Sequence, residues 1–307
     1  MKRKQTVTII GAGRMGTALG IALSKCGFRI LSVVSRNPAS AQKTAKLIEV
    51  ETSRLPVAVD LRMIPSDQIG DVLVLTTSDD VIARIVVLLA ERFSHTVDRK
   101  GKRHVRVALH TSGVLSSETL LPLREYNFST GSLHPLVSVV KTTEGAAGLR
   151  GAYYCLEGEP KAVDTAKEIV AALGGTFSVI EPHQKALYHA AAVMAAGHLT
   201  VLLNQAQEML THCGIEETVA LAMLLSLSSS VLENLKTEDP TRALTGPFVR
   251  GDFATIKKHI EALEEEGMSQ VLETYLALGR GALLIAEQSG LARESVTQLK
   301  SLLNDAD

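Results

Sequence analysis

The sequence opens on a short apolar stretch that runs into a glycine-rich turn. Residues 6–10 (Thr-Val-Thr-Ile-Ile) precede Gly11-Ala12-Gly13-Arg14-Met15-Gly16, and an alanine- and leucine-rich run follows. In a strand–turn–helix start of this kind the first glycine allows the tight turn, the second admits a pyrophosphate near the backbone, and the third lets helix and strand pack closely. The helix N-terminus offers free N–H groups to phosphate. We therefore predict a dinucleotide site at Gly11, Gly13, Arg14, Met15 and Gly16; the alternative is a glycine turn without a ligand.

The end of the second predicted strand indicates which dinucleotide binds. Residues 29–34 form this strand, and Ser35-Arg36-Asn37 stand where NAD-binding proteins carry an acidic residue for the ribose 2′-hydroxyl. A serine hydroxyl and an arginine fork suit a 2′-phosphate instead. Ser35 and Arg36, with Arg14 from the glycine turn, thus predict NADP as the cofactor. The alternative is a solvated arginine at a strand end.

Length, charge and cysteine content bound the class of protein. The chain has 307 residues, 46% of them hydrophobic, which suffices for two domains with sizeable cores. Its 32 basic and 33 acidic side chains nearly cancel, so we expect neither nucleic acid nor an anionic membrane surface as a partner. The three cysteines lack metal-ligand spacing and indicate a reducing compartment. Because no signal-type apolar segment follows the basic first residues, we expect a cytoplasmic protein.

Strand and helix patterns alternate through the first half of the chain. After Glu181-Pro182 only helical patterns remain, at residues 183–212, 216–236, 252–266, 268–289 and 291–303. This order predicts an α/β fold in which residues 1–181 form a Rossmann-type, doubly wound and mainly parallel sheet that binds NADP. Residues 182–307 are expected to form an all-helical domain for substrate binding and dimerisation.

Two apolar segments stand out in the helical half. Residues 186–203 contain no Asp, Glu, Lys or Arg, which reaches the lower length limit of a membrane span. Because histidines, alanines and a glycine interrupt the segment, we expect a buried helix instead, with His198 in its core. The second run, 221–227, is too continuous for a helix with one wet face and predicts a homodimer through the C-terminal helices; burial within one subunit is the alternative.

Polar residues gather where ligands bind in an open α/β sheet, outside the carboxyl ends of the strands. The predicted tips are Thr76-Thr77-Ser78-Asp79, His110-Thr111-Ser112-Gly113 and His134-Pro135. We assign five of these residues to the cofactor: Thr76, Thr77, Ser78, His110 and Ser112. Helix capping is the alternative for Thr77 and Ser78.

The first helix of the second domain carries two candidate catalytic residues. Lys185 and His189 are four positions apart and therefore share one face. Ala192 and Ala196 continue this face with small side chains, which leaves room for nicotinamide or substrate. A lysine that lays its stem along apolar surface is the alternative for Lys185.

Five motifs together resemble the Rossmann-like proteins that carry a DUF2520 C-terminal domain. They are the glycine turn, the Thr-x-Ser-Asp-Asp sequence at 76–80, and the segments 132–136, 185–192 and 244–252. The resemblance covers nearly the whole chain. It implies an architecture similar to that of ketopantoate reductases, 6-phosphogluconate and 3-hydroxyacid dehydrogenases, and F420-dependent NADP oxidoreductases.

The resemblance also implies roles for single residues. In such reductases an early lysine on the first interdomain helix acts as acid or base or binds the substrate oxygen, and Lys185 stands at that position. The His-Pro tip resembles that of prephenate dehydrogenases, which implies a catalytic role for His134. Where relatives often carry an asparagine about three turns after the lysine, this chain has Gly197, which departs from a hydroxyacid-type substrate clamp.

The sequence thus predicts an NADP-dependent oxidoreductase that moves hydride between nicotinamide and a small oxo, hydroxy or imino acid; a ketopantoate-like substrate rests on family analogy alone. Lys185 or His134 delivers the proton, with His189 beside them. Arg250 can pair with a substrate carboxylate, although a structural ion pair is the alternative. The rival functions are a non-catalytic dinucleotide-binding regulatory or scaffold protein and a prephenate dehydrogenase-like oxidative enzyme.

Overall fold

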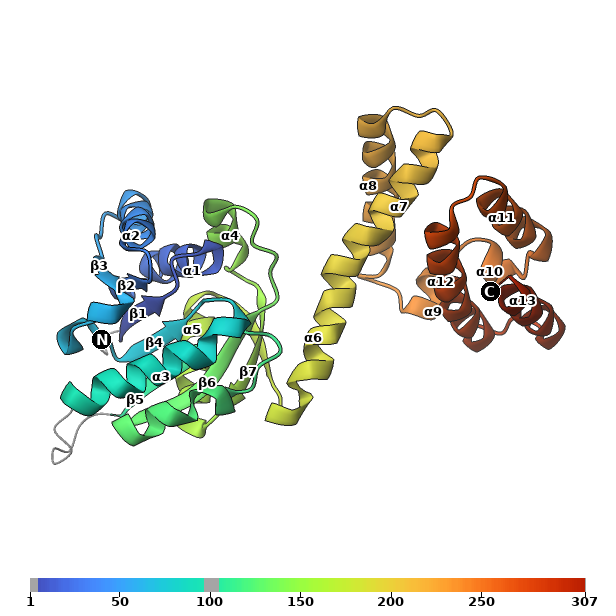
Figure 1. The fold of residues 1–307 in the computed structure, drawn as a ribbon. Helices are drawn as coiled ribbons and strands as arrows, with labels where there is room; N and C mark the ends of the chain where they lie inside the picture. Colours follow the sequence, from blue (N-terminus) through green and yellow to red (C-terminus); the bar gives the residue numbers. More distant parts are fainter. Residues whose placement is uncertain (1–4, 97–104, 307) are drawn as a thin grey trace. The chain divides into compact units, whose positions relative to one another are not determined.

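The computed structural model describes residues 5–96 and 105–306 of the chain. These residues form two compact units, Met1–Met194 and Ala195–Asp307. The boundary lies within a long helical stretch (Figure 1), thirteen residues after the predicted limit at 181. Each unit is described by itself below.

The N-terminal unit is built on an eight-stranded sheet with the order β3-β2-β1-β4-β5-β6-β7-β8 (Figure 1). The strands are β1 (Thr6–Ile10), β2 (Arg29–Ser35), β3 (Val57–Asp60), β4 (Val72–Leu75), β5 (Arg106–His110), β6 (Phe128–Pro135), β7 (Tyr153–Gly158) and β8 (Thr176–Val179). Every neighbouring pair is parallel except β6 and β7. The predicted Rossmann-type, mainly parallel sheet is confirmed, and the carboxyl ends of β1 to β6 share one edge.

Alternation along the central strands sorts their side chains onto two buried faces. In β4, Val72 and Val74 join one core while Leu73 and Leu75 join the other. The first core is covered by α1 (Arg14–Lys25), α2 (Pro38–Thr52), α4 (Thr142–Gly148) and α5 (Pro160–Ala172). The second is covered by α3 (Asp79–Thr96) and the 3-10 helix η3 (Ser117–Tyr126). Helices on both faces leave the carboxyl edge as the place where polar groups can meet.

The C-terminal unit contains only helices among its described residues, so the predicted all-helical second domain is confirmed. They are α7 (Leu199–His212), α8 (Glu217–Asn234), α9 (Pro240–Ala243), α10 (Pro247–Arg250), α11 (Phe253–Glu265), α12 (Ser269–Gln288) and α13 (Arg293–Asp305). Aliphatic side chains of α11, α12 and α13 form its core. The pair α7 and α8 contributes little to that core.

The stretch before this unit is helical from Pro182 to His212, through η4 (Pro182–Gln184), α6 (Lys185–Val193), a π-helical turn η5 (Met194–His198) and α7. By length and composition alone it could cross a membrane, a criterion that core helices of soluble proteins also meet. The expectation of a buried helix over 186–203 is wrong for the single chain, because no residue of this segment is buried and His198 is exposed.

Close packing at the glycine turn can be tested with one methyl group. In Gly16→Ala the new Cβ would lie 2.0 Å from Gly11 O and 2.5 Å from Thr76 Oγ1, whereas in Gly13→Ala it would meet no atom within 4 Å. We expect Gly16→Ala to lower the free energy of unfolding by about 1–3 kcal/mol or more, as overpacking does. Urea unfolding followed by circular dichroism measures it. Equal midpoints for the two variants would contradict the packing described here.

Candidate active site

The glycine turn brings three strand ends together. Gly11, at φ +116°, donates its N–H to Val34 O at 2.9 Å, and its own carbonyl accepts a hydrogen bond from Thr76 Oγ1 at 2.9 Å. The helix α1 then begins without a side-chain cap at Gly13 and without an acidic residue in its first turn. Free N–H groups and the positive dipole end therefore point into the turn, as an anion site requires.

A cavity of about 600 Å³ lies beside this turn, a size typical of small-molecule sites. Its lining includes seven of the predicted cofactor-binding residues: Gly11, Gly13, Ser35, Arg36, Thr76, Thr77 and Ser78. The Thr76 hydroxyl is engaged by backbone carbonyls, but the Thr77 hydroxyl is buried and has no hydrogen-bond partner in the described chain. An unsatisfied buried hydroxyl costs free energy, so a ligand that accepts or donates there would stabilise it.

Ser35 and Arg36, the two residues expected to contact a 2′-phosphate, lie at the tip of β2 and line the cavity. Arg36 is exposed, and Ser35 Oγ accepts the Asn37 N–H at 3.2 Å. Asp60 of β3 pairs in register with Ser35, but Arg62 holds its carboxylate from two nitrogens, at 3.1 and 2.7 Å. The hydrogen bonds from Arg62 lower the pKa of Asp60 to about 2.

Three residues of the glycine motif lie outside the cavity lining. Arg14 is exposed, Met15 packs partly against the core, and Gly16 is buried against Gly11 and Thr76. Gly16 thus has the packing role of the third glycine. Contacts of Arg14 and Met15 with a cofactor stay predictions.

Lys185 lies buried at the carboxyl edge, only 1% exposed. Its Nζ donates to Ser112 O at 2.8 Å and to Ser132 Oγ at 3.1 Å, and Ser132 Oγ donates to Glu157 Oε2 at 3.3 Å. Glu157 is itself completely buried, so one hydroxyl joins a buried amine to a buried carboxylate. Burial lowers the pKa of Lys185, while Cys155 and Glu157 oppose that shift.

The loop after β5 is held by hydrogen bonds to buried side chains, among them two residues predicted to contact the cofactor. His110 is completely buried; its Nδ1 accepts from Ser112 N at 3.2 Å and its Nε2 lies 3.2 Å from Ser116 O. Glu157 accepts from Ser117 N at 2.9 Å and Ser117 Oγ at 2.5 Å. Both ring nitrogens of His110 are therefore engaged by the loop, and contacts of His110 and Ser112 with a cofactor stay predictions. The Ser112 side chain is likewise buried and accepts backbone N–H groups of its own loop.

Two further imidazoles meet above this loop. His134 Nδ1 lies 2.7 Å from the Tyr188 hydroxyl, and the His134 and His189 rings are perpendicular with centroids 5.7 Å apart. Burial, with Lys185 and His189 nearby, lowers the pKa of His134 to about 4. A Cβ on Gly113 would lie 2.9 Å from His134 Nε2 and 2.3 Å from His189 Nδ1, so the glycine gives both rings their room.

The structure thus joins Lys185, His134 and His189 as the sequence predicted, and adds three residues that sequence reasoning missed. Tyr188 shares the helical face of Lys185, a signal available from its i+3 spacing. Cys155 and Glu157 come from β7, where Cys155 pairs with His134. Only the antiparallel register of β7 brings them here, and no local pattern in the sequence encodes that register.

Arg250 lies in the C-terminal unit, exposed at the end of α10. Asp252 caps the following helix α11 by accepting the Thr255 N–H at 3.1 Å. The pairing of Arg250 with a substrate carboxylate stays a prediction.

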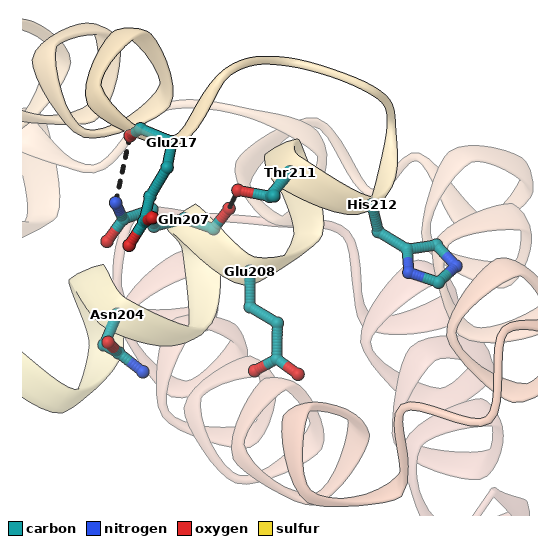
Figure 2. Close-up of a pocket in the computed structure, with 6 residues that line it drawn as sticks. All are labelled: Asn204, Gln207, Glu208, Thr211, His212 and Glu217. Atoms are coloured by element: carbon teal, nitrogen blue, oxygen red, sulfur yellow. Dashed lines mark hydrogen bonds between the residues drawn. The ribbon is translucent and has the colours of Figure 1, made fainter.

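The same unit carries a polar hollow of about 420 Å³ on α7 and α8, shown in Figure 2. Its lining residues are Asn204, Gln207, Glu208, Thr211, His212 and Glu217. Gln207 Nε2 donates to Glu217 O at 3.0 Å, which ties the end of α7 to the start of α8. None of the predicted site residues lines this hollow, and His212 at its rim is bonded to Glu266 after α11, at 2.7 Å.

Comparisons with known proteins agree with this architecture. Residues 1–135 match the family model of a Rossmann-like domain, and residues 152–282 match that of a domain of unknown function, DUF2520. No curated protein matches the sequence. The predicted resemblance is confirmed by the two family matches.

Solved structures share the fold at low identity. Protein TM1727 from Thermotoga maritima is 22% identical, with 92% of this chain and 98% of that chain covered and a TM-score of 0.69. A candidate NADP oxidoreductase from Bacteroides fragilis is 20% identical, with 91% and 98% covered and a TM-score of 0.67. An imine reductase from a Pseudomonas species is 14% identical, with 98% and 100% covered and a TM-score of 0.62.

The lowered histidine pKa values predict a pH-dependent stability. Burial and then Lys185 lower the pKa of His110 to about 4, and the pKa of His134 is also about 4. Below about pH 6.5 the unfolded imidazoles bind protons that the native ones do not. The free energy of unfolding should therefore fall as pH drops from 6.5 towards 4, by up to about 1.4 kcal/mol per pH unit for each histidine.

Urea unfolding between pH 7.5 and 5, in steps of roughly half a unit, measures this slope. His110→Gln should reduce the slope by about one histidine's share, while the exposed His183→Gln should leave it unchanged. A His110→Gln slope equal to that of the unmodified chain would show that His110 does not contribute.

Proposed function

Because the chain combines a Rossmann-like domain with a DUF2520 domain, we propose that it is an NADP-dependent oxidoreductase acting on a small oxo, hydroxy or imino acid. One observation carries the proposal. The glycine-turn cavity at the tips of β1, β2 and β4 and the Lys185–His134 cluster at the tips of β5 and β6 share one carboxyl edge. Ligands of open α/β sheets bind in that crevice, where the strand order reverses between β1 and β4.

The residues of the cavity fit NADP. The first-turn N–H groups of α1 would bind the pyrophosphate, and Arg36 with Ser35 would hold the 2′-phosphate. The unpartnered Thr77 hydroxyl would gain a partner. When bound, the nicotinamide supplies or accepts the hydride.

Lys185 and His134 would provide the polar groups that contact the reacting atoms of the substrate. His134 Nε2 has no hydrogen-bond partner among the described residues, so it is free to meet a substrate oxygen or nitrogen. Lys185 turns its amine towards Ser112 and Ser132, and its positive charge would favour negative charge developing on the substrate. The name of the Pseudomonas neighbour supports an imine as well as a carbonyl substrate.

The proposed partners are therefore a small acid and a second copy of the chain. We propose no nucleic acid or membrane partner and a location in the cytoplasm.

The proposal is tested by NADPH oxidation with a panel of small 2-oxo acids, ketopantoate included, and cyclic imino acids. Turnover of at least one compound, with one reduced product per NADPH consumed, is the expected result. NADPH binding without oxidation by any of them would favour a non-catalytic dinucleotide-binding protein, and NADP⁺ reduction by a cyclic acid alone would favour the oxidative alternative.

Lys185→Met should lower kcat by about a hundredfold or more with the best compound of this panel, because it removes the buried charge and donor while keeping most of the volume. NADPH affinity, measured by calorimetry, should change little. Lys161→Met, exposed on α5, is the matched control and should retain kcat. If Lys185 only binds a substrate carboxylate, KM rises with a smaller loss of kcat; unchanged kcat and KM would exclude both roles.

The cofactor preference follows from the tip of β2. NADPH should bind more tightly than NADH in calorimetric titrations, and Arg36→Ala should remove most of the difference because it removes the fork for the 2′-phosphate. Arg54→Ala, an exposed arginine of the same unit, serves as the control. Equal affinities of the unmodified chain for NADPH and NADH would sink the idea.

A homodimer through the C-terminal helices is proposed from the exposed apolar side chains of α8. In the run 221–227, where Ser226 is the one polar residue, Met223 is 50% exposed, Leu225 48% and Leu227 63%. Such a surface on a monomer marks an interaction site. Light scattering at micromolar concentration should give the dimer mass, and Leu227→Glu should shift it towards the monomer. Val50→Glu, at an exposed position of α2, should not; a monomeric unmodified chain would refute the dimer.

A further inference from the structure

The hydrogen bond between Tyr188 and His134 determines which nitrogen of His134 a ligand meets. The two groups lie 2.7 Å apart, and their rings are nearly perpendicular at 87°. We propose that Tyr188 is the positioning residue of His134: its hydroxyl donates to Nδ1 and thereby keeps the ring proton on Nε2, so that the site presents a neutral N–H donor. The role of that donor towards a substrate rests on the proposed function, whereas the position of the proton does not.

The direction of this hydrogen bond follows from the protonation of its two partners. A neutral imidazole carries one proton, on either nitrogen, and a tyrosine hydroxyl can donate or accept. Burial, together with the nearby Lys185, His189 and His110, lowers the pKa of His134 to about 4, so the ring is neutral at pH 7. Burial and Cys155 raise the pKa of Tyr188, so the hydroxyl keeps its proton.

The neighbours of the hydroxyl decide where its proton points. The Tyr188 hydroxyl is hydrogen-bonded to His134 Nδ1 at 2.7 Å, and Cys155 is the neighbouring side chain that raises its pKa. A thiol sulfur is a weak acceptor, whereas a bare imidazole nitrogen is a strong one, so the hydroxyl donates to Nδ1. Burial raises the pKa of Cys155, which therefore stays a thiol.

His134 Nε2, on the side of the ring away from Tyr188, lies beside Gly113 and His189. His134 Nε2 and His189 Nδ1 both face the Cα of Gly113, and His189 Nδ1 is buried without a partner in the described chain. With the proton on Nε2, His134 offers a donor to a ligand atom with a lone pair, such as a carbonyl or carboxylate oxygen. A neutral imidazole in this state polarises a carbonyl as a hydrogen-bond donor and not as a charged acid.

Nitrogen-15 NMR of the full chain, labelled on histidine, tests the position of the proton, because protonated and bare imidazole nitrogens have well-separated shifts. The His134 signals are assigned by their loss in His134→Gln. At pH 7 the unmodified chain should show His134 as the Nε2–H form alone. In Tyr188→Phe the Nδ1–H form should appear, to a tenth of the population or more.

Tyr154→Phe is the matched control, because it removes another buried tyrosine hydroxyl, bonded to Leu149 O at 2.5 Å, from the same unit. It should leave the His134 signals unchanged. A His134 proton on Nδ1 in the unmodified chain would overturn the inference even if Tyr188→Phe did not fold, and so would an unaltered Nε2–H form in a folded Tyr188→Phe. Because the spectra require no turnover, an inactive protein with the Nε2–H form would contradict the proposed function and still support this inference.

Discussion

The buried amine of Lys185 is the charge around which the carboxyl edge of the sheet is organised. It is 1% exposed, its direct acceptors are the neutral Ser112 carbonyl and Ser132 hydroxyl, and the carboxylate of Glu157 lies one hydroxyl further in. Removing two ions from water costs several kcal/mol each, which good geometry and further hydrogen bonds must offset. Glu157 meets that condition because it also binds Ser117 through the backbone N–H and the hydroxyl. The loop after β5 is thereby held from two sides by the same pair of charges.

This arrangement decides what the neighbouring imidazoles can do. Burial and the nearby Lys185 keep His110 and His134 neutral at pH 7. Fixed donors beside a buried positive charge favour a substrate on which negative charge develops, and they need not reorganise during the reaction. An imidazolium at His134 would instead repel Lys185 in the same low-dielectric space.

The parts of this site that are predictable from the sequence are those encoded locally. The glycine turn, the alternating strands and helices, and the pairing of Lys185 with His189 on one face all depend on residues within a few positions of one another. Glu157 and Cys155 were missed because the antiparallel register of β7 against β6 brings them to the site, and that register is set by tertiary packing. His110 was assigned to the cofactor from its place at a strand tip, whereas its burial depends on the loop that folds over it. The segment 186–203 was expected to be buried because its composition is apolar. Apolar composition does not show whether residues of the same chain or of a partner bury a helix.

The helix α6 carries both site residues and part of the exposed apolar segment. Lys185, Tyr188 and His189, at positions i, i+3 and i+4, turn one face towards the strand tips, while Leu187 between them is 78% exposed. A single rigid element thus presents polar groups to the site on one side and an apolar side chain outwards on the other. Because α6 continues through a π-helical turn into α7 without a break in helical structure, a cover placed on its apolar side would restrict the same helix that positions Lys185 and Tyr188. The exposed apolar side chains of α6 would then stabilise the site once they are covered. A helix packed on both sides would keep the Lys185 amine at 2.8 Å from the Ser112 carbonyl.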